Sequence, residues 1–324
     1  MMATSADVAQ HAGLSRSTVS QILNGREHLF SEETIARVRA SAAVLGYRPS
    51  LAGRTLARGT SDIVITLIPD VTFNPRLREL VDIITADLTA AGLTNLLRFV
   101  GSEESLHDTL LGLKPFGVVS LAPLPPAQER RIREHGVHLI AQPREAQVAI
   151  DEEIGRLQAR YLTDAGYDTL AVVVPVAVRE RGFALPRERG AKAWCSEQGV
   201  RVLPTLRVAL ERGGAQAAVA KLPPRPVGLV AYNDEVALAV LGAALHQGRR
   251  TPEDFGLIGV DNSSIARAST PSITTVDYDI AFSGHAIAGL LLQRLNVQDV
   301  ADPAHQVTDR LRVVAGDTTP APTS

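Results

Sequence analysis

From residue 63 onward, two kinds of hydrophobic pattern alternate along the chain. Short runs rich in Val, Ile and Leu are typical of buried parallel strands. They cover residues 62–68, 95–100, 117–122, 137–141, 170–175, 228–232 and 255–260. Between them, longer stretches repeat apolar residues at helical spacing, and most end at a glycine. These cover residues 76–92, 152–166, 188–199 and 234–248. The alternation predicts an α/β fold with two doubly wound lobes.

The first 47 residues follow a different pattern, with three short amphipathic helices. The expected N-caps are Ser5, Ser15 and Ser31, and the expected stops are Gly13, Gly25 and Gly46. A tight turn joins the first two helices, and the third provides the remaining side of a small core. This order predicts a helix-turn-helix head.

The second predicted helix has an unusually polar outer face. Val19, Ile22 and Leu23 form one apolar stripe, while Ser17 and Gln21 project on the other side without any acid. A face that only meets water is one explanation, but such faces usually carry Glu and Lys. Gln can pair with adenine and Arg with guanine in the major groove. The pattern therefore favours a DNA-reading face.

Charge is unevenly distributed along the chain. Residues 1–60 contain seven arginines and four acids, a net charge of +3, which leaves −5 for the rest of a chain whose total is −2. A basic head on an acidic body indicates that the head contacts an anionic partner such as nucleic acid, although chance remains an alternative.

A short apolar helix is predicted between the head and the lobes, in residues 48–60. It would begin after Pro49, with a thin apolar face formed by Leu51, Ala52, Thr55 and Leu56. It is shorter than the roughly 12–15 residues that make a helix stable alone in water, and Gly53 weakens it by a further ~1 kcal/mol. We expect it to be ordered only when something packs against it.

Several motifs together resemble the LacI/GalR family of bacterial transcription regulators. They are SADVAQHAGLSRSTVSQILNG, SEETIARVRASAAVLGYRP, LAGRTLARG, GAKAWCSEQG, AYNDEVALA, PEDFGLIGVDN and STPSITTV. The resemblance covers nearly the whole chain. It implies a helix-turn-helix head (1–47), a hinge helix and linker (48–60) and an effector-binding and dimerisation domain (61–324). That domain is expected to have two Rossmann-like, periplasmic-binding-protein-like subdomains, about 61–150 with 279–306 and about 151–278 with 307–324. Three crossing strands and a ligand cleft would lie between them.

The resemblance also implies roles in DNA binding. Arg16, Ser17 and Gln21 would contact bases, and Thr18, Ser20, Ser31 and Tyr47 would contact phosphates. Leu56 would be a wedge in the minor groove, and a bent operator would in turn pack against the hinge helix. Gln21 departs from the arginine often found at its position, so we expect an altered base preference.

For the cleft, the resemblance implies a small-molecule effector. Its predicted contacts are Phe73, Asn74, Arg76, Arg187, Asn233, Asp234 and Asp261. Helix capping by Asp234 and a strand-end turn at Asp261 are the structural alternatives. Phe183, Tyr232 and Trp194 are further candidates, although Trp194, on a predicted helix, is better explained as a core residue. The effector could be a sugar, a sugar phosphate or other anionic metabolite met by Arg76 and Arg187, or it could be lacking altogether.

Other classes of function are not supported by the sequence. It contains no G-x-G-x-x-G, P-loop or G-x-S-x-G motif and no metal-spaced His/Cys set, so we expect no enzyme, cofactor or metal. A lone Cys195, no apolar span and no secretory signal favour the cytoplasm. We expect a homodimeric repressor of metabolic, carbohydrate-related genes that binds a pseudo-palindromic operator. The alternatives are a solute-binding protein and a regulator without an effector.

Overall fold

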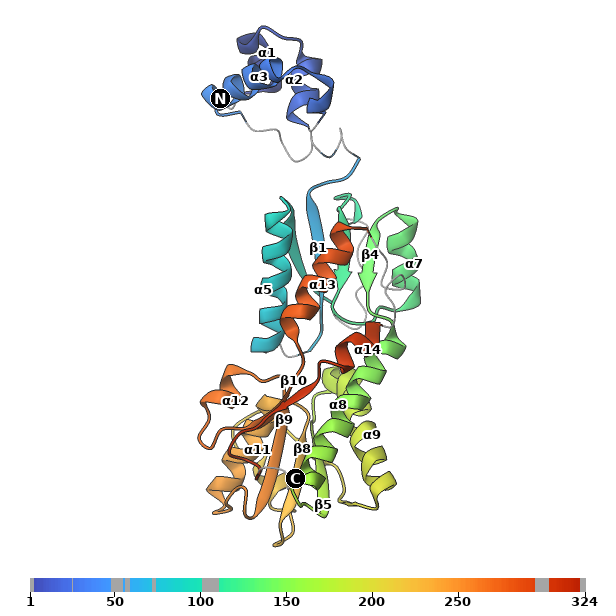
Figure 1. The fold of residues 1–324 in the computed structure, drawn as a ribbon, viewed down its shortest axis with the longest axis vertical. Helices are drawn as coiled ribbons and strands as arrows, with labels where there is room; N and C mark the ends of the chain where they lie inside the picture. Colours follow the sequence, from blue (N-terminus) through green and yellow to red (C-terminus); the bar gives the residue numbers. More distant parts are fainter. Residues whose placement is uncertain are drawn as a thin grey trace.

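The computed structural model describes residues 3–24, 26–47, 55, 59–71, 74–100, 111–294 and 303–320. The head lies at one end of the molecule, and two α/β lobes follow it along the long axis (Figure 1). Among the described residues, no helix is both long enough and apolar enough to span a bilayer.

The head contains three α-helices, as the sequence predicts. They are α1 (Ser5–Ala12), α2 (Arg16–Leu23) and α3 (Glu32–Val44), with a 3-10 turn, η1 (Glu27–Leu29), before α3. Val8, Val19, Ile22 and Val38 are fully buried between them. This is the small core that the apolar stripes predict.

The caps of the head helices correct one prediction and confirm two. Thr4, not Ser5, caps α1: its Oγ1 accepts from the Asp7 amide, and the Asp7 carboxylate accepts from the Thr4 amide over 2.7 Å. This reciprocal pair satisfies donors at both positions, which Ser5 could not do from inside the first turn. Ser15 and Ser31 cap α2 and α3 as expected.

The first lobe is built on a four-stranded parallel sheet of order β2-β1-β3-β4. Its strands are β1 (Ile63–Pro69), β2 (Thr94–Val100), β3 (Gly117–Ser120) and β4 (His138–Ala141). Helices α5 (Pro75–Ala90) and α13 (Ile280–Leu292) pack against each other on one face, where Ile84, Leu88 and Leu291 are buried. Helix α7 (Pro126–Glu134) covers the other face through Ile132.

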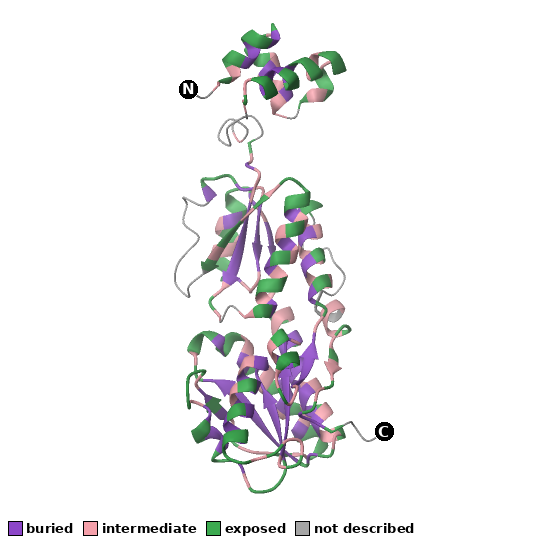
Figure 2. Cartoon of the chain, turned by 90° about the vertical axis from the view of Figure 1, so that its left-hand side faces the viewer, coloured by how far each residue is buried: buried purple, intermediate pink, exposed green. Residues whose placement is uncertain are grey.

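The second lobe has a longer sheet of order β11-β10-β9-β8-β5-β6, with β7 also pairing with β5. The strands are β5 (Thr169–Pro175), β6 (Arg201–Val202), β7 (Leu206–Val208), β8 (Val227–Ala231), β9 (Phe255–Val260), β10 (Thr274–Asp277) and β11 (Arg312–Val314). All pairs are parallel except β10 with β11. All residues of β5, β8 and β9 are buried, which explains their continuous apolar runs (Figure 2).

Helices complete the second lobe on both faces of its sheet. They are α8 (Arg144–Asp164), α9 (Arg181–Gln198), α10 (Gln216–Val219), α11 (Asp234–His246), α12 (Ser264–Ala268) and α14 (Pro303–Thr308), with a 3-10 turn, η2 (Val178–Glu180). The chain passes between the lobes three times: before α8, between β10 and α13, and between α13 and β11. The carboxyl ends of the parallel strands face the region between the lobes, where ligands bind in such folds.

Candidate nucleic-acid interface and inter-lobe cavity

The outer face of α2 carries the three predicted base-contacting residues at the surface of the head. Arg16 and Ser17 are exposed and Gln21 is half-buried, whereas Val19 and Ile22 point into the core. Gln21 Nε2 donates to Ser17 Oγ over 3.4 Å, and Arg16 Nε donates to Ser5 Oγ over 3.2 Å. These long contacts hold the polar groups on one face, where a nucleic acid can replace them.

Two of the four predicted phosphate contacts, Thr18 and Ser31, lie at helix starts, Ser20 lies within α2, and Tyr47 follows α3. The Ser15 and Thr18 hydroxyls share a 2.8 Å hydrogen bond, and Ser31 Oγ accepts from the Thr34 amide at the start of α3. Ser20 Oγ accepts from Asn24. Tyr47 is half-buried against the head core. Helix N-termini favour anions, so the start of α2, whose first turn has no acid, suits a phosphate electrostatically, whereas the first turn of α3 carries Glu32 and Glu33.

Two predicted site residues, Leu56 and Phe73, lie outside the described residues. Within the predicted hinge helix, the Gly59 amide donates to the Thr55 carbonyl over 2.8 Å, a helical spacing. The roles of these two residues stay predictions.

A cavity of about 640 Å³ lies between the lobes. This volume falls in the range of pockets for small molecules, roughly 300–1,000 Å³. Of the predicted effector contacts, it is lined by Asn74, Arg187, Asn233 and Asp261, together with the candidates Phe183 and Tyr232. Trp194 is instead packed on the core of the second lobe, with its indole N–H 3.3 Å from Thr163.

Arg187, on α9, is held by a buried carboxylate. Its Nε donates to Asp151 over 2.8 Å, its Nη1 donates to the Tyr232 carbonyl over 2.7 Å, and its guanidinium lies 4.9 Å from the centre of the Tyr232 ring. Burial opposes the charge of Arg187, but Asp151 and the other acidic groups nearby outweigh it and raise its pKa. For Asp151, burial is the largest effect and raises the pKa. The pair is a preformed, internally neutralised group in the cavity wall.

Asp261 follows β9 at the edge of the cavity. Its φ of 108° is a conformation that non-glycine residues rarely adopt and that occurs in tight turns and at functional sites. Asn74 Nδ2 donates to its carboxylate over 3.0 Å and the Tyr278 hydroxyl over 3.4 Å. Burial, opposed in part by Arg187, raises the pKa of Asp261 to about 7.

Asp234 does not line the cavity, although its neighbour Asn233 does. Its carboxylate accepts from the Ser263 amide over 2.8 Å and from the Thr275 hydroxyl over 2.6 Å. Asn233, rather than Asp234, caps α11 by accepting from the Val236 amide. Asp234 thus joins α11 to the loop after β9, and a direct ligand contact by this residue stays a prediction.

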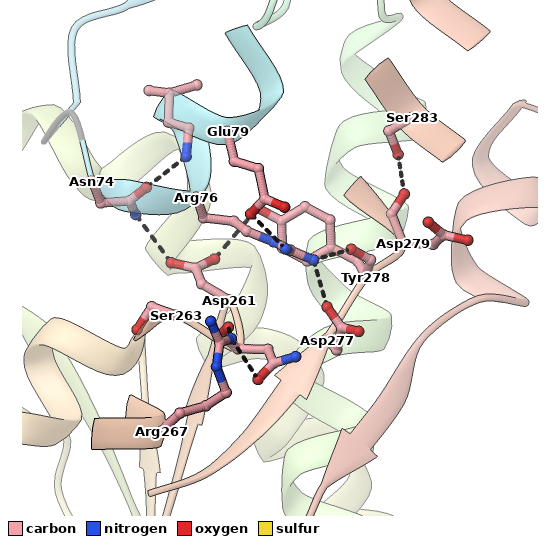
Figure 3. Close-up of polar contacts among 12 residues, drawn as sticks. Asn74, Arg76, Glu79, Asp261, Ser263, Arg267, Asp277, Tyr278, Asp279 and Ser283 are labelled. Atoms are coloured by element: carbon pink, nitrogen blue, oxygen red, sulfur yellow. Dashed lines mark hydrogen bonds and ion pairs between the residues drawn. The ribbon is translucent and has the colours of Figure 1, made fainter. Parts of the chain in front are cut away.

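Arg76 likewise lies off the cavity lining, on the first turn of α5. Its guanidinium donates to Asp277 at the end of β10 and to the Tyr278 carbonyl, and it also bonds Glu79 (Figure 3). The prediction that Arg76 meets an effector is untested, and this arginine is occupied by partners within the chain.

Sequence reasoning missed Asp151, Glu180 and Tyr278, all of which line the cavity. Glu180 is buried and accepts from the Tyr232 hydroxyl over 3.0 Å. Asp151 is the first of three successive acids at 151–153 and precedes the predicted helix, which began at residue 152, so no pattern singled it out. Glu180 and Tyr278 carry no local signal either.

The chain matches two family models and a curated relative. Residues 4–50 match the model of bacterial regulatory proteins of the lacI family, and residues 159–319 match a periplasmic binding protein-like domain. The ribose operon repressor of Bacillus subtilis (strain 168) is 29% identical over 94% of this chain and 96% of its own length.

Solved structures show the same fold. The Lac repressor dimer bound to operator and the anti-inducer ONPF matches with a TM-score of 0.74 and 18% identity, covering 98% of this chain and 99% of the other. A LacI family regulator from Enterococcus faecium with bound ribose matches with a TM-score of 0.63 and 20% identity, covering 81% of this chain and 100% of the other.

Proposed function

The chain belongs to the lacI family of bacterial regulatory proteins, and from this premise we propose that it is a dimeric repressor controlled by a small molecule between its lobes. The observation that carries this proposal is a helix-turn-helix head, with an acid-free polar face on α2, joined to two lobes that enclose a cavity. Repression is supported by the ribose operon repressor, which aligns over almost the whole chain.

On the DNA side, two copies of the head would place their α2 helices in successive major grooves. Because the dimer has twofold symmetry, the operator would be an approximate palindrome. Arg16, Ser17 and Gln21 would contact bases while the four predicted phosphate contacts hold the DNA backbone. Leu56 would enter the minor groove at the centre and order the hinge helix. Such a regulator acts on chromosomal DNA in the cytoplasm.

On the ligand side, we propose a neutral, hydroxyl-rich effector such as a monosaccharide. Arg187 is paired with Asp151, and Arg76 is paired with Asp277 and Glu79, so neither offers an unpaired positive charge to an anionic group. Carboxylates and amides that accept and donate hydrogen bonds suit hydroxyl groups, and Phe183 and Tyr232 supply apolar surface. The cavity would bind this ligand without chemical change.

Gel-shift assays with fragments of the host genome test the DNA-binding function. We expect the full-length protein to shift one or a few fragments that contain an imperfect palindrome and to leave the rest unbound. Failure to shift any fragment would contradict the regulator and favour a solute-binding protein.

Thermal-shift screening of the full-length protein tests the ligand class. We expect stabilisation by D-ribose or another neutral monosaccharide and a smaller effect from the corresponding phosphate, followed by a change in operator binding. Stabilisation by sugar phosphates alone would contradict the neutral effector.

A further inference from the structure

The start of α5 is attached to the second lobe at two points. Arg76 contacts Asp277 at the end of β10, and Asn74 contacts Asp261 after β9 (Figure 3). Asn74 and Arg76 stand two residues apart in sequence, but their partners differ in one respect: Asp261 lines the cavity and Asp277 does not. A ligand between the lobes therefore meets only one of the two contacts.

The Arg76–Asp277 contact is buried and doubly reinforced. The side chains of Arg76 and Asp277 are 9% and 4% exposed. Arg312 of β11 donates to the other oxygen of Asp277 over 2.7 Å, and Arg76 also donates to the Tyr278 carbonyl over 2.8 Å. Removing one partner of a buried ion pair leaves an uncompensated charge, so this contact resists opening.

The Asn74–Asp261 contact is a single hydrogen bond of 3.0 Å in the cavity wall. The same Asn74 side chain caps α5, since its Oδ1 accepts from the Leu77 amide over 2.8 Å. Its amide nitrogen therefore reaches the second lobe while its oxygen holds the first turn of the helix. The donors to Asp261 from Asn74 and Tyr278 are neutral groups, which other neutral or cationic donors can replace.

We propose that the Asn74–Asp261 hydrogen bond is a releasable contact between the lobes, which a ligand in the cavity breaks. The Arg76–Asp277 ion pair then stays closed and is the fixed point about which α5 turns. The proposal rests on the proposed function, because it needs a ligand in the cavity. It also restricts the ligand: the group that replaces Asn74 on Asp261 must donate a hydrogen bond, as a hydroxyl or ammonium does. An anionic group brings only acceptors and leaves the contact in place.

Because of the position and length of α5, a small rotation at its start produces a larger displacement at its far end. The helix runs from the inter-lobe region toward the end of the first lobe nearest the head (Figure 1). Just beyond it, the Thr94 amide bonds the Asp62 carbonyl, next to the segment that leads to the head. A 16-residue helix is about 24 Å long, so a turn of about 5° at its start moves its far end by about 2 Å.

The inference is tested by the distance between nitroxide labels on the two lobes of the full-length protein. The substitutions Ala127→Cys on α7 and Ser196→Cys on α9 place labels at exposed positions, and the protein without them is the blank for the buried Cys195. The distance between the labels is measured by pulsed electron paramagnetic resonance. The protein is measured without DNA or ligand, so the result does not depend on the outcome of the gel shifts.

Asn74→Asp is the decisive variant because it keeps an acceptor for the Leu77 amide but places a second carboxylate against Asp261. We expect a longer mean distance between the labels or a broader distribution of distances. In the double variant Asn74→Asp with Asp261→Asn, donor and acceptor exchange places, and the wild-type distance should return. Asn233→Asp is the matched control, since this residue also caps a helix and lines the cavity but bonds within its own lobe.

The fixed point is tested with Arg76→Met, which should broaden the distance distribution more than Asn74→Asp. Arg78→Met is its control, because Arg78 lies on the same helix in an exposed pair with Asp82. An unchanged distance in Asn74→Asp, a double variant that does not recover, or an equal change in Asn233→Asp would overturn the releasable contact. A wild-type distribution in Arg76→Met would overturn the fixed point.

Discussion

At the scale of single residues, Gln21 gives the head its own predicted base preference. Its amide lies on the exposed side of α2 beside Ser17. An amide pairs with adenine and a guanidinium with guanine, each with a discrimination of about 1–3 kcal/mol. Gln21→Arg should therefore replace adenine by guanine at one position in each half-site, as measured by selection from random sequences. The control Gln10→Arg adds the same charge on α1, and an identical shift there would contradict base reading by Gln21.

Asp261 makes a prediction about pH. Its pKa is about 7 in the folded protein, against a reference value of 3.8. The folded state therefore binds this proton more tightly than the unfolded state does. The contribution of protonated Asp261 to the free energy of unfolding is full below pH 4 and is lost as the pH rises toward 7. Asp261→Asn should gain stability relative to wild type by up to about 1.4 kcal/mol for each pH unit across this window. Urea unfolding at pH 5, 6, 7 and 8 measures the difference, and a value independent of pH would contradict the raised pKa.

The sequence predicts some site residues and not others for a physical reason. Asn233 and Asp261 directly follow apolar strands, whose carboxyl ends meet between the lobes, so their place on the cavity could be predicted. The partner of Arg76, in contrast, is Asp277, 201 positions further along the chain. No local pattern encodes such a pair, because it depends on how the two lobes pack against each other.

At the scale of elements, the strands inside the two sheets were predictable because burial on both faces requires continuous apolar runs, whereas the edge strand β2 keeps its apolar run although Leu96, Leu97 and Phe99 are exposed. The two-residue β6 and three-residue β7 are too short for a pattern. Helix α8 begins eight residues before its predicted start, since Pro143 stands at the cap without a side-chain hydrogen bond and the polar Gln147 and Asp151 face the cavity. These polar residues on the cavity interrupt the apolar pattern that would otherwise have predicted the first turns of the helix.

The α8–α9 crossing depends on two glycines in close contact. A Cβ at Gly155 would lie 2.0 Å from the Arg187 carbonyl oxygen, and one at Gly190 would lie 1.9 Å from the Glu152 carbonyl oxygen. Gly155→Ala should destabilise the second lobe by about 1–3 kcal/mol or more and displace Arg187. Urea unfolding followed by the fluorescence of Trp194, the single tryptophan, on α9 measures this effect.

Gly242→Ala is the control for that crossing. Gly242 is also helical, in α11, but a Cβ there meets nothing within 4 Å. Since alanine is the better helix former, this variant should gain about 1 kcal/mol. Equal effects at Gly155 and Gly242 would show that helix propensity, rather than the close crossing, decides the result.

At the scale of the whole molecule, the cavity and the head are connected by one short route. The cavity lies at the start of α5, and the other end of α5 adjoins the residues that lead to the head. The predicted hinge helix is too short to be stable alone, so a small displacement of its base in two paired copies would be enough to decide whether it forms. This route requires that two copies of the chain hold their first lobes together.

Strand β2 is where we expect the second copy to bind. It is the edge strand of the first sheet, and its Leu96 and Leu97 are 37% and 44% exposed. An exposed apolar edge pairs readily with another chain, and a twofold axis would place the same patch of each copy against the other. The Lac repressor, which shares this fold, was solved as a dimer on its operator.

Leu97→Lys should therefore weaken the dimer, because two copies of the new charge would face each other across the axis. We expect a dimer dissociation constant at least about tenfold higher by analytical ultracentrifugation, equivalent to about 1.4 kcal/mol. Operator affinity should fall as well, since a single head loses the high effective concentration that its linked partner provides. Leu185→Lys on α9, a leucine of similar exposure in the other lobe, should leave both unchanged. A dimer that survives Leu97→Lys would place the interface on a different surface of the lobes.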